Sequence, residues 1–378
     1  MLDLRNVEVR TRIDHDGHLR IWLQDVAIQA PGRDEVLVRM EAAPLNPSDQ
    51  LLLFGPVDAA TLKQSGTAQQ PVIEGRVPSE RLAAIAGRLG QSLPVGNEGA
   101  GTVIAAGSDT LSWVGKRVAL RGTTGTFSRY QTVKAADCLV LPEGVSAREG
   151  AAAFINPLTA LGMVETLRRE GHTALVHTAA ASNLGQMLNR LCLADGVPLV
   201  NIVRSEEQVR LLRDQGAQFV LNSNADDFRS ALQKALEATG ATLAFDAIGG
   251  GTTAGTLLSA MEAAASSRLT RYSRYGSPIH KQVYIYGVLD PSPRVLDGQF
   301  GMAWGVGGWL MTWFYERIDA GDAARLRARA TDGLTTLFAS HFSAEIGLEQ
   351  MLSLDAIAAY TRRATGTKFL VLPQAGWV

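Results

Sequence analysis

The 378-residue chain is poor in the residues that build disulfide frameworks and zinc sites. It has two cysteines and six histidines, too few for a disulfide scaffold or a cysteine-rich zinc lobe. The chain also lacks a large excess of positive or negative charge, because 36 lysine and arginine residues offset 37 aspartate and glutamate residues. This balance gives no electrostatic footprint for nucleic acid and little attraction to an anionic membrane surface. We therefore expect neither nucleic acid nor a membrane among its partners.

Long hydrophobic runs are missing as well. Residues 1–6 carry early charges and no apolar run, so they do not have the form of a secretory signal. The stretch Gly298–Tyr315 contains no charged residue, but five glycines interrupt it, and a membrane-spanning helix needs about 20 mainly apolar residues. We interpret this stretch as a buried loop that leads into a helix, rather than as a site of membrane contact. We expect a protein of the cytoplasm.

Glycine, by contrast, is plentiful. The chain has 38 glycines in 378 residues, whereas aromatic residues make up only 6%. This glycine content is above average usage. Because glycine adopts positive φ angles freely and lets a backbone approach a ligand closely, it predicts many tight turns or close ligand contacts.

The first part of the chain has the pattern of a β-rich, barrel-like domain. Short apolar runs alternate with glycines and prolines at close spacing, which is typical of strands joined by turns. Asn46 followed by Pro47 predicts a helix start, since asparagine caps helices and proline suits the first turn. The predicted strands are Glu35–Met40, Gly101–Ala105, Arg117–Leu120 and Tyr130–Val133.

The middle of the chain alternates strands and helices regularly. This alternation predicts a parallel, doubly wound sheet of the α/β class with right-handed crossovers. Residues 146–169 are helical in composition, a further helix is expected around Ala323–Phe338, and the strand Lys368–Leu372 is expected to return to the first domain. The predicted alternating elements are strands 174–177, 198–203, 219–221 and 243–246, and helices 183–192, 206–215 and 226–238.

A nucleotide-binding loop is predicted between the first strand and the first helix of this alternation. Backbone N–H groups and the helix N-terminus attract a pyrophosphate there. Only the last small position of the dinucleotide fingerprint is a glycine, and an ordinary loop of small residues is the alternative. The candidate residues of the loop are Ala181, Ser182, Asn183, Leu184 and Gly185.

The end of the second strand indicates which nucleotide binds. NAD-binding proteins usually place an acid there against the ribose 2′-hydroxyl, but this chain has Arg204 and Ser205, with no acid before Glu206. A guanidinium pairs well with a 2′-phosphate, which favours NADPH. The alternative is that Arg204 is a solvated charge at the end of a strand.

Taken together, the motifs resemble the medium-chain dehydrogenase/reductase superfamily over nearly the whole chain. The resemblance implies a Rossmann cofactor domain, residues 150–316, inserted in a GroES-like catalytic domain of residues 1–149 and 317–378. Substrate and nicotinamide would then meet in a cleft between the domains. The resemblance is carried by Ala43–Asp49, Val95–Gly101, Asn156–Ala160 and Ala181–Gly185.

Within this superfamily the chain departs from the zinc alcohol dehydrogenases. Their ligand positions are occupied here by Asn46 and Asn97, with Asn156 near the third, and amides are poor ligands for Zn²⁺. We therefore expect no metal and a similarity to the zinc-free branch, which contains quinone oxidoreductases and 2-enoyl thioester reductases. The enoyl reductases carry a proton-donating tyrosine shortly after the Asn-Pro-Ser-Asp motif, whereas no tyrosine precedes Tyr130 here.

The expected activity is hydride transfer from NADPH to a quinone or an activated α,β-unsaturated carbonyl. A quinone needs the least acid assistance because the charge of its reduced oxygen is delocalised. The alternatives are a 2-enoyl thioester reductase with a relocated proton donor and a non-catalytic NADPH-binding sensor or structural protein. Asn46 and Asn97 are the candidate catalytic amides, although capping and turn formation are equally ordinary roles for asparagine.

The remaining candidate residues follow from the same resemblance. Glu98 is expected to orient its neighbours rather than to act as a base. The chain is expected to form a homodimer and to act on a small-molecule substrate. The aromatic residues of Gly298–Tyr315 would line a pocket or the dimer core, and residues 268–276 form an exposed basic loop or a cover over the cofactor. The additional cofactor-binding candidates are Asn156, Thr159, Gly287 and Lys368.

Overall fold

The computed structural model describes residues 4–122, 124–362 and 365–376 of the chain. The chain divides into two compact units. The first comprises Met1–Ile155 and Ala330–Val378, and the second comprises Asn156–Arg329. The predicted α/β class is confirmed, because one unit is rich in β-strands and the other contains a parallel sheet with helices. The domain boundaries expected at 149/150 and 316/317 stay a prediction.

Two sheets form the framework of the first unit. The five-stranded sheet has the order β4-β5-β2-β1-β6, with strands β1 (Asn6–Ile13), β2 (His18–Val26), β4 (Asp58–Gly66), β5 (Pro71–Arg76) and β6 (Leu93–Pro94). The seven-stranded sheet has the order β10-β8-β7-β3-β18-β17, with β9 beside β3. Its strands are β3 (Glu35–Pro44), β7 (Glu98–Ala106), β8 (Arg117–Arg121), β9 (Tyr130–Lys134), β10 (Cys138–Val140), β17 (Ala344–Ile346) and β18 (Phe369–Val371).

The C-terminal strand β18 returns to the first unit, as predicted. It pairs antiparallel with the end of β3, with Leu370 opposite Pro44 and Val371 opposite Ala43. Lys368, which directly precedes β18, is therefore close in space to the segment that starts the first helix. The helices of the unit are α1 (Pro47–Phe54), α2 (Ser79–Leu82), α3 (Ala147–Gly150), α11 (Leu348–Met351) and α12 (Leu354–Thr361), with 3₁₀ turns at Ala83–Arg88, Ser108–Trp113 and Ala135–Asp137.

The second unit is built on a six-stranded parallel sheet of order β13-β12-β11-β14-β15-β16. Its strands are β11 (Leu175–His177), β12 (Leu199–Val203), β13 (Phe219–Asn222), β14 (Leu243–Asp246), β15 (Lys281–Ile285) and β16 (Trp304–Gly308). The helices are α4 (Ile155–Arg169), α5 (Asn183–Asp195), α6 (Glu206–Asp214), α7 (Phe228–Thr239), α8 (Thr253–Ser266), α9 (Met311–Arg317) and α10 (Ala320–Asp332).

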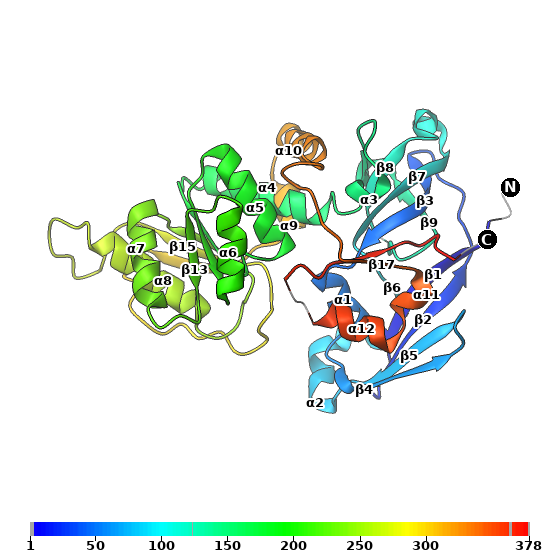
Figure 1. The fold of residues 1–378 in the computed structure, drawn as a ribbon, viewed down its shortest axis with the longest axis horizontal. Helices are drawn as coiled ribbons and strands as arrows, with labels where there is room; N and C mark the ends of the chain where they lie inside the picture. Colours follow the sequence, from blue (N-terminus) through cyan, green and yellow to red (C-terminus); the bar gives the residue numbers. More distant parts are fainter. Residues whose placement is uncertain (1–3, 123, 363–364, 377–378) are drawn as a thin grey trace. The chain divides into compact units, whose positions relative to one another are not determined.

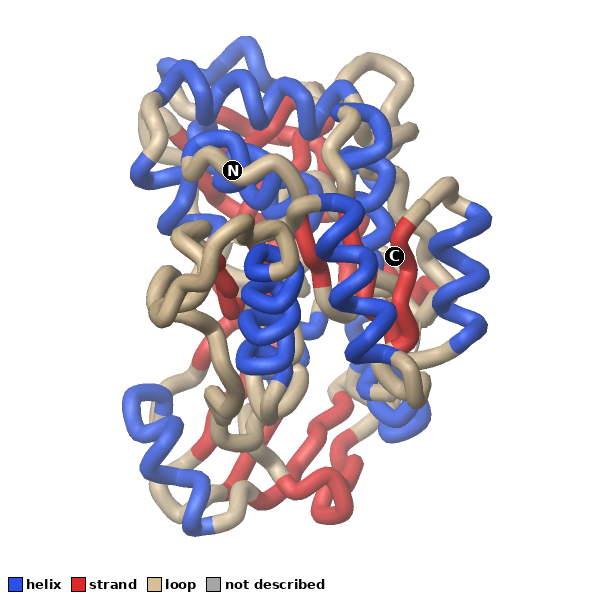
Figure 2. Tube along the Cα trace, turned by 90° about the vertical axis from the view of Figure 1, so that its left-hand side faces the viewer, coloured by secondary structure: helices blue, strands red, loops and turns tan. Residues whose placement is uncertain are grey.

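Helices cover both faces of this parallel sheet. Leu232 of α7 and Leu258 of α8 pack with Val176 and Val200 in one buried cluster, whereas Leu212 of α6 packs with the opposite face. Figure 1 shows α7 and α8 on one side of the strands and α5 and α6 on the other. Seen from the side of α7 and α8, helices stand in front of strands (Figure 2). The predicted doubly wound arrangement is therefore confirmed.

Two expectations about helix bounds were wrong. The helical stretch predicted over 146–169 is interrupted at residues 151–154, and α4 begins at Ile155. The interruption has a physical cause, because the N–H groups of Phe154 and Ile155 donate to the Glu98 carboxylate. Helix α10 spans Ala320–Asp332 rather than Ala323–Phe338.

The stretch Gly298–Tyr315 is not a buried loop. It contains the edge strand β16 and the start of α9, and Met302 is 76% exposed. Glycines suit this edge strand because Gly305 faces the Gln282 side chain, where a Cβ would come within 2.6 Å. Within the described ranges, no helix is long and apolar enough to cross a membrane. Cytoplasmic location and a homodimer stay predictions.

A buried ion pair fixes the loop that joins α8 to β15. Lys281 is fully buried and its Nζ donates to the Glu262 carboxylate. The same carboxylate accepts the Ser277 N–H at 2.7 Å and the Ser266 hydroxyl at 2.7 Å. Burial raises the pKa of Glu262, but these hydrogen bonds outweigh burial and hold it below its usual value. The pair stays charged because each partner satisfies the other.

Lys281→Met should lower the free energy of unfolding by about 3–5 kcal/mol, because it leaves a buried carboxylate without its cation. Urea denaturation at neutral pH measures the change. The exposed control Lys234→Met should change it by at most about 0.5 kcal/mol. The double variant Lys281→Met with Glu262→Gln should be more stable than Lys281→Met alone. Equal effects of Lys281→Met and Lys234→Met would contradict a structural role for the pair.

Candidate functional site

A cluster of buried polar side chains in the first unit begins at helix α1. Asn46 is the N-cap of this helix, as the Asn-Pro pair predicts, and its backbone N–H donates to Asp49 Oδ2 at 2.7 Å. The side-chain amide of Asn46 points toward Glu98, and its Nδ2 donates to Glu98 Oε1 at 2.8 Å. Asn46 and Asp49 are both buried. The helix start therefore delivers one amide and one carboxyl group to the interior.

Glu98 accepts hydrogen bonds from three donors in two separate segments. Besides the Asn46 amide, the backbone N–H groups of Phe154 and Ile155 donate to its Oε2 at 3.0 and 2.8 Å. Glu98 is fully buried at the start of β7. Its side chain therefore positions neighbouring groups, which agrees with the orienting role expected for it.

Asn97 joins the same cluster through its backbone. Its N–H donates to Asp49 Oδ1 at 2.9 Å, while its side-chain Nδ2 donates to Ser48 Oγ at 2.9 Å. Asp49 thus accepts from both Asn46 and Asn97, one with each oxygen. The polar ends of Ser48 and Asn97 face outward, since Ser48 is exposed and Asn97 is half-buried.

Lys368 adds a cation to the cluster. Its Nζ is buried and has no hydrogen-bond partner among the residues described, and it lies 5.6 Å from the centre of the Phe342 ring. Burial lowers the pKa of Lys368, while the charges of Glu98 and Asp49 raise it. An unpaired buried amine beside two carboxyl groups is a place where an anionic group would find a donor.

Burial dominates the ionisation of both acids. It raises the pKa of Asp49 to about 7, against the opposing effect of the two backbone N–H donors. Burial likewise raises the pKa of Glu98, opposed by Lys368 and by its hydrogen-bond donors. The cluster therefore contains one carboxyl group, that of Asp49, that can hold a proton close to neutral pH.

In the second unit, the predicted phosphate loop follows β11. Ser182 caps α5, and its Oγ accepts the Gly185 N–H at 3.1 Å. A Cβ at Gly185 would lie 2.2 Å from the Ala180 carbonyl oxygen, so only glycine fits. Ala179 has φ +51°, an unusual left-handed conformation for a residue other than glycine. The loop reaches the tight geometry of a glycine-rich turn with alanine in the strained position. The other members, Ala181, Asn183 and Leu184, lie at this helix start.

A polar brace fixes the adjoining strand ends. The Thr178 hydroxyl donates to Asp246 Oδ1 at 2.7 Å and accepts the Ala247 N–H at 2.8 Å. Asp246 also accepts the N–H groups of Ile248 and Gly249 at 2.9 and 3.1 Å. The carboxyl ends of β11 and β14, where this sheet reverses its direction of strand order, are thereby held rigid. Ligands of open α/β sheets bind at such a point.

Arg204 and Ser205 lie at the end of β12, at the same edge of the sheet. Arg204 is exposed, and its backbone is held by Gln208 Oε1 and by the Asn224 amide at 2.9 and 2.8 Å. Ser205 caps α6 and accepts the Gln208 N–H at 3.3 Å. The guanidinium is thus free to point beyond the strand while its backbone is fixed.

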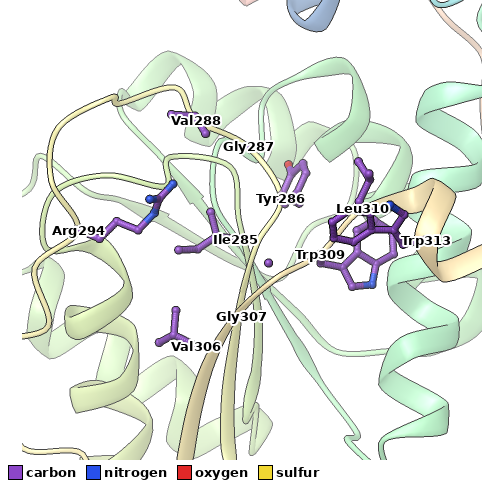
Figure 3. Close-up of a pocket in the computed structure, with 11 residues that line it drawn as sticks. Ile285, Tyr286, Gly287, Val288, Arg294, Val306, Gly307, Trp309, Leu310 and Trp313 are labelled. Atoms are coloured by element: carbon purple, nitrogen blue, oxygen red, sulfur yellow. The ribbon is translucent and has the colours of Figure 1, made fainter. Parts of the chain in front are cut away.

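Gly287 follows β15 and lies against the end of β14. A Cβ there would come within 2.7 Å of the Ala247 carbonyl oxygen. Next to it is an open pocket of about 480 Å³, formed entirely by the second unit. Figure 3 shows its lining, with Trp309 and Trp313 on the side opposite Arg294. Trp304 and Phe314 do not line it, although both were candidates.

Asn156 and Thr159 lie in the first turns of α4, Asn156 half-buried and Thr159 buried. Of the predicted site residues, the structure brings together Asn46, Asn97 and Lys368 in the first unit. In the second unit it brings the loop Ala181–Gly185, the pair Arg204–Ser205 and Gly287 to one edge of the sheet. Their functions stay predictions.

Known proteins show similarity to this chain in sequence. Residues 32–143 match the family model of the alcohol dehydrogenase GroES-like domain. The chain is 30% identical over 159 residues to the quinone oxidoreductase of Pseudomonas aeruginosa, covering 41% of this chain and 49% of the relative. It is 31% identical over 212 residues to the mitochondrial enoyl-(acyl-carrier-protein) reductase of Xenopus tropicalis, covering 53% and 51%. The chain therefore spans about half the length of these relatives.

The comparison of folds extends over nearly the whole chain. The structure of Escherichia coli quinone oxidoreductase complexed with NADPH matches 97% of this chain and 100% of that chain, with a TM-score of 0.67 and 19% identity. This likeness shows the shared fold. The chain has the fold of this oxidoreductase, with a match to the GroES-like domain in residues 32–143.

The two asparagines of the cluster in the first unit are engaged in hydrogen bonds. The Asn46 amide donates a hydrogen bond to a carboxylate, and the Asn97 amide donates to a serine hydroxyl. Among the described residues, no group of three or more histidine, cysteine, aspartate or glutamate side chains is arranged to hold a metal ion. The donor set of this cluster therefore fits hydrogen bonding.

Sequence reasoning missed several residues of the candidate site. Asp49 stands inside the motif that carried the resemblance, but its burial was not foreseen. His177 was not singled out either; its Nε2 lies 2.7 Å from the Tyr286 hydroxyl, and burial lowers the pKa of His177 to about 3. Arg294 lies in a loop that no periodicity distinguishes. A signal for Asp49 was available, because an acid at the third position of a capped helix accepts the cap's own N–H.

The raised pKa of Asp49 gives a prediction about pH. The folded protein holds this proton up to about pH 7, whereas an unfolded chain releases it near pH 4. Fewer protons are then bound by the unfolded chain, so the free energy of unfolding should fall as pH rises from about 4 to about 7. Asp49→Asn should flatten this slope in urea titrations at pH 5 to 8. The exposed Asp34→Asn should keep it, and parallel slopes for all three proteins would contradict the titration.

Proposed function

We propose that the protein is an NADPH-dependent reductase that transfers hydride to a quinone or an activated α,β-unsaturated carbonyl without a metal. The observation that carries the proposal is the geometry at the ends of β11 and β12, a tight loop onto a helix N-terminus beside an exposed arginine. A helix N-terminus with free N–H groups binds pyrophosphate. The arginine, in a place where NAD-binding proteins usually have an acid, suits a 2′-phosphate.

Two further features fit this cofactor. Gly185 lets the start of α5 pack closely on the loop, since a Cβ would lie 2.2 Å from the Ala180 carbonyl oxygen, as the last glycine of a dinucleotide fingerprint does. Lys368 Nζ is buried without a hydrogen-bond partner in the described part of the chain, as expected for a donor that awaits an anionic or polar group. Asn156, Thr159 and Gly287 are proposed to contact the cofactor as well. Bound NADPH would supply the hydride.

The chain's own residues would orient the acceptor and hold charge. One quinone, one NADPH and one proton give one hydroquinone and one NADP⁺, so two electrons move with the hydride and a proton must follow. Hydride addition puts negative charge on the acceptor oxygen, and preorganised donors there lower the barrier. The outward amide of Asn97 and the Ser48 hydroxyl are proposed as such polar groups, and Asn46 as the group that keeps Glu98 in place.

The proton requirement favours a quinone over an enoyl thioester. Residues 51–57 contain no tyrosine, and in the first unit Tyr130 and Tyr360 are buried. A reduced quinone oxygen takes its proton from water because its charge is delocalised. An enoyl thioester would need an acid elsewhere, and Asp49 is the buried carboxyl group whose pKa lies close to neutrality.

The function is tested by following NADPH absorbance with 1,4-naphthoquinone, an enone such as methyl vinyl ketone, and crotonyl coenzyme A. Oxidation with the quinone or the enone supports the proposal. Oxidation with crotonyl coenzyme A alone would assign the protein to the enoyl thioester reductases. Tight NADPH binding without oxidation by any of the three would make it a binding protein without turnover.

The cofactor assignment predicts the effect of Arg204→Glu. A carboxylate would repel the 2′-phosphate, so the dissociation constant for NADPH should rise about 30-fold or more, since a charge-assisted hydrogen bond contributes about 1.5–3 kcal/mol. NADH binding should change less than about threefold by the same reasoning. Nucleotide fluorescence measures both. The control Arg210→Glu, on the exposed side of α6, should leave both constants unchanged, and equal losses for the two nucleotides would reject the assignment.

A further inference from the structure

We propose that the pocket at the carboxyl ends of β15 and β16 binds a planar aromatic acceptor that carries an anionic substituent, with Arg294 as the residue that selects for the anion. This inference rests on the proposed function and names the substrate class for it. The pocket of about 480 Å³ lies wholly within the second unit. Pockets for small molecules typically measure about 300–1,000 Å³, so a bicyclic quinone is of suitable size.

The walls of the pocket favour a flat, apolar ring system. Trp309 is held in place by its Nε1, which donates to Thr166 Oγ at 3.1 Å, and by Phe245, whose ring meets it edge-on at 5.4 Å. Trp313 is 57% exposed, so its ring is accessible to a ligand in the pocket. Between the tryptophans and Arg294 lie aliphatic residues, glycines and Tyr286 (Figure 3). An aromatic ring stacks favourably on such surfaces.

Arg294 is the one charged residue among those that line the pocket. Its backbone is held in place, because Gly251 pairs with it in an isolated bridge and the Val295 N–H donates to the Gly251 carbonyl oxygen at 2.9 Å. Its guanidinium forms no hydrogen bond or ion pair with the residues described. The nearby Asp290 carboxylate accepts the Ser292 N–H at 2.8 Å instead. A fixed stem with an unpaired guanidinium suits a carboxylate, sulfonate or phosphate.

The position of the pocket favours an anion of the substrate over the phosphates of the cofactor. The phosphate loop follows β11, and the order β11-β14-β15-β16 puts three strand spacings between that strand and β16. Neighbouring strands lie about 4.8 Å apart, so the pocket is roughly 14 Å from the pyrophosphate site along the sheet edge. Gly287, the candidate for the nicotinamide end, borders the pocket. An acceptor in the pocket would therefore lie beside the place where hydride leaves.

Two quinones that differ by one anionic group test the inference. Wild-type protein and Arg294→Gln are compared with 1,2-naphthoquinone-4-sulfonate and 1,2-naphthoquinone as acceptors for NADPH. Arg294→Gln should lower kcat/KM for the sulfonate about tenfold, as the loss of one exposed charge-assisted hydrogen bond predicts, and should leave the neutral quinone within about twofold. Arg294→Lys should restore part of the loss. Arg271→Gln, an exposed arginine outside the pocket, should affect neither acceptor.

A binding measurement separates this inference from the proposed function. The sulfonate should quench tryptophan fluorescence without NADPH, less strongly in Trp313→Phe, and with a raised dissociation constant in Arg294→Gln. If this binding holds but neither quinone oxidises NADPH, the reductase function fails and the pocket assignment stands. If both quinones turn over and Arg294→Gln affects them equally or not at all, the assignment of Arg294 fails. A weaker NADPH affinity in Arg294→Gln would give Arg294 to the cofactor and overturn the inference.

Discussion

A carboxylate that is fully removed from water must be surrounded by donors, and Glu98 meets this constraint with three. The Asn46 amide and the N–H groups of Phe154 and Ile155 come from two segments that are far apart in the chain from each other and from Glu98. An unpaired donor or acceptor in such a place costs about 1–3 kcal/mol, so the start of α1, the start of β7 and the beginning of α4 are fixed to one another. The break between α3 and α4 is a consequence, because the backbone groups that would continue a helix are committed to Glu98.

The same constraint determines how the cluster treats charge. Asp49 uses both oxygens for the backbone N–H groups of Asn46 and Asn97, which leaves its charge opposed mainly by burial. The Nζ atom of Lys368 is buried nearby and has no hydrogen-bond partner among the described residues. The cluster therefore combines two acids of raised pKa with an amine of lowered pKa. Amides at the would-be metal positions fit this arrangement, since they donate to carboxylates.

The sequence predicted those parts of the structure that local rules govern. The helix start at Asn46 and Pro47, the alternation of strands and helices, and the loop before α5 all follow from capping, periodicity and glycine placement. Features that depend on distant partners were not accessible in this way. The interruption at residues 151–154 depends on Glu98, more than 50 positions earlier in the chain. Composition suggested burial for Gly298–Tyr315, but an edge strand exposes residues such as Met302 whatever their hydrophobicity.

The candidate site divides along the same line. Arg204 could be named from the sequence because its place at the end of the second strand has a chemical meaning that needs no tertiary contact. Arg294 could not, because its significance arises only when β15 and β16 pair and bring Trp309 and Trp313 to the other side of one pocket. Buried pairs such as Glu262 and Lys281 were missed for the same reason, since each looks like a surface charge in the sequence.

The pocket beside Arg294 and the polar cluster around Glu98 would have separate roles in a reductase that works without a metal. An anchor for an anionic substituent would bind a part of the acceptor that does not react, and such binding energy orients the reacting carbon. Orientation matters most when little acid assistance is available, and residues 51–57 contain no tyrosine to provide it. An acceptor that is already electron-poor needs only placement beside the nicotinamide and donors near its oxygen. A fixed aromatic pocket with one cation, together with a separate proton-holding cluster, meets those two needs with different residues, so either could vary without disturbing the other.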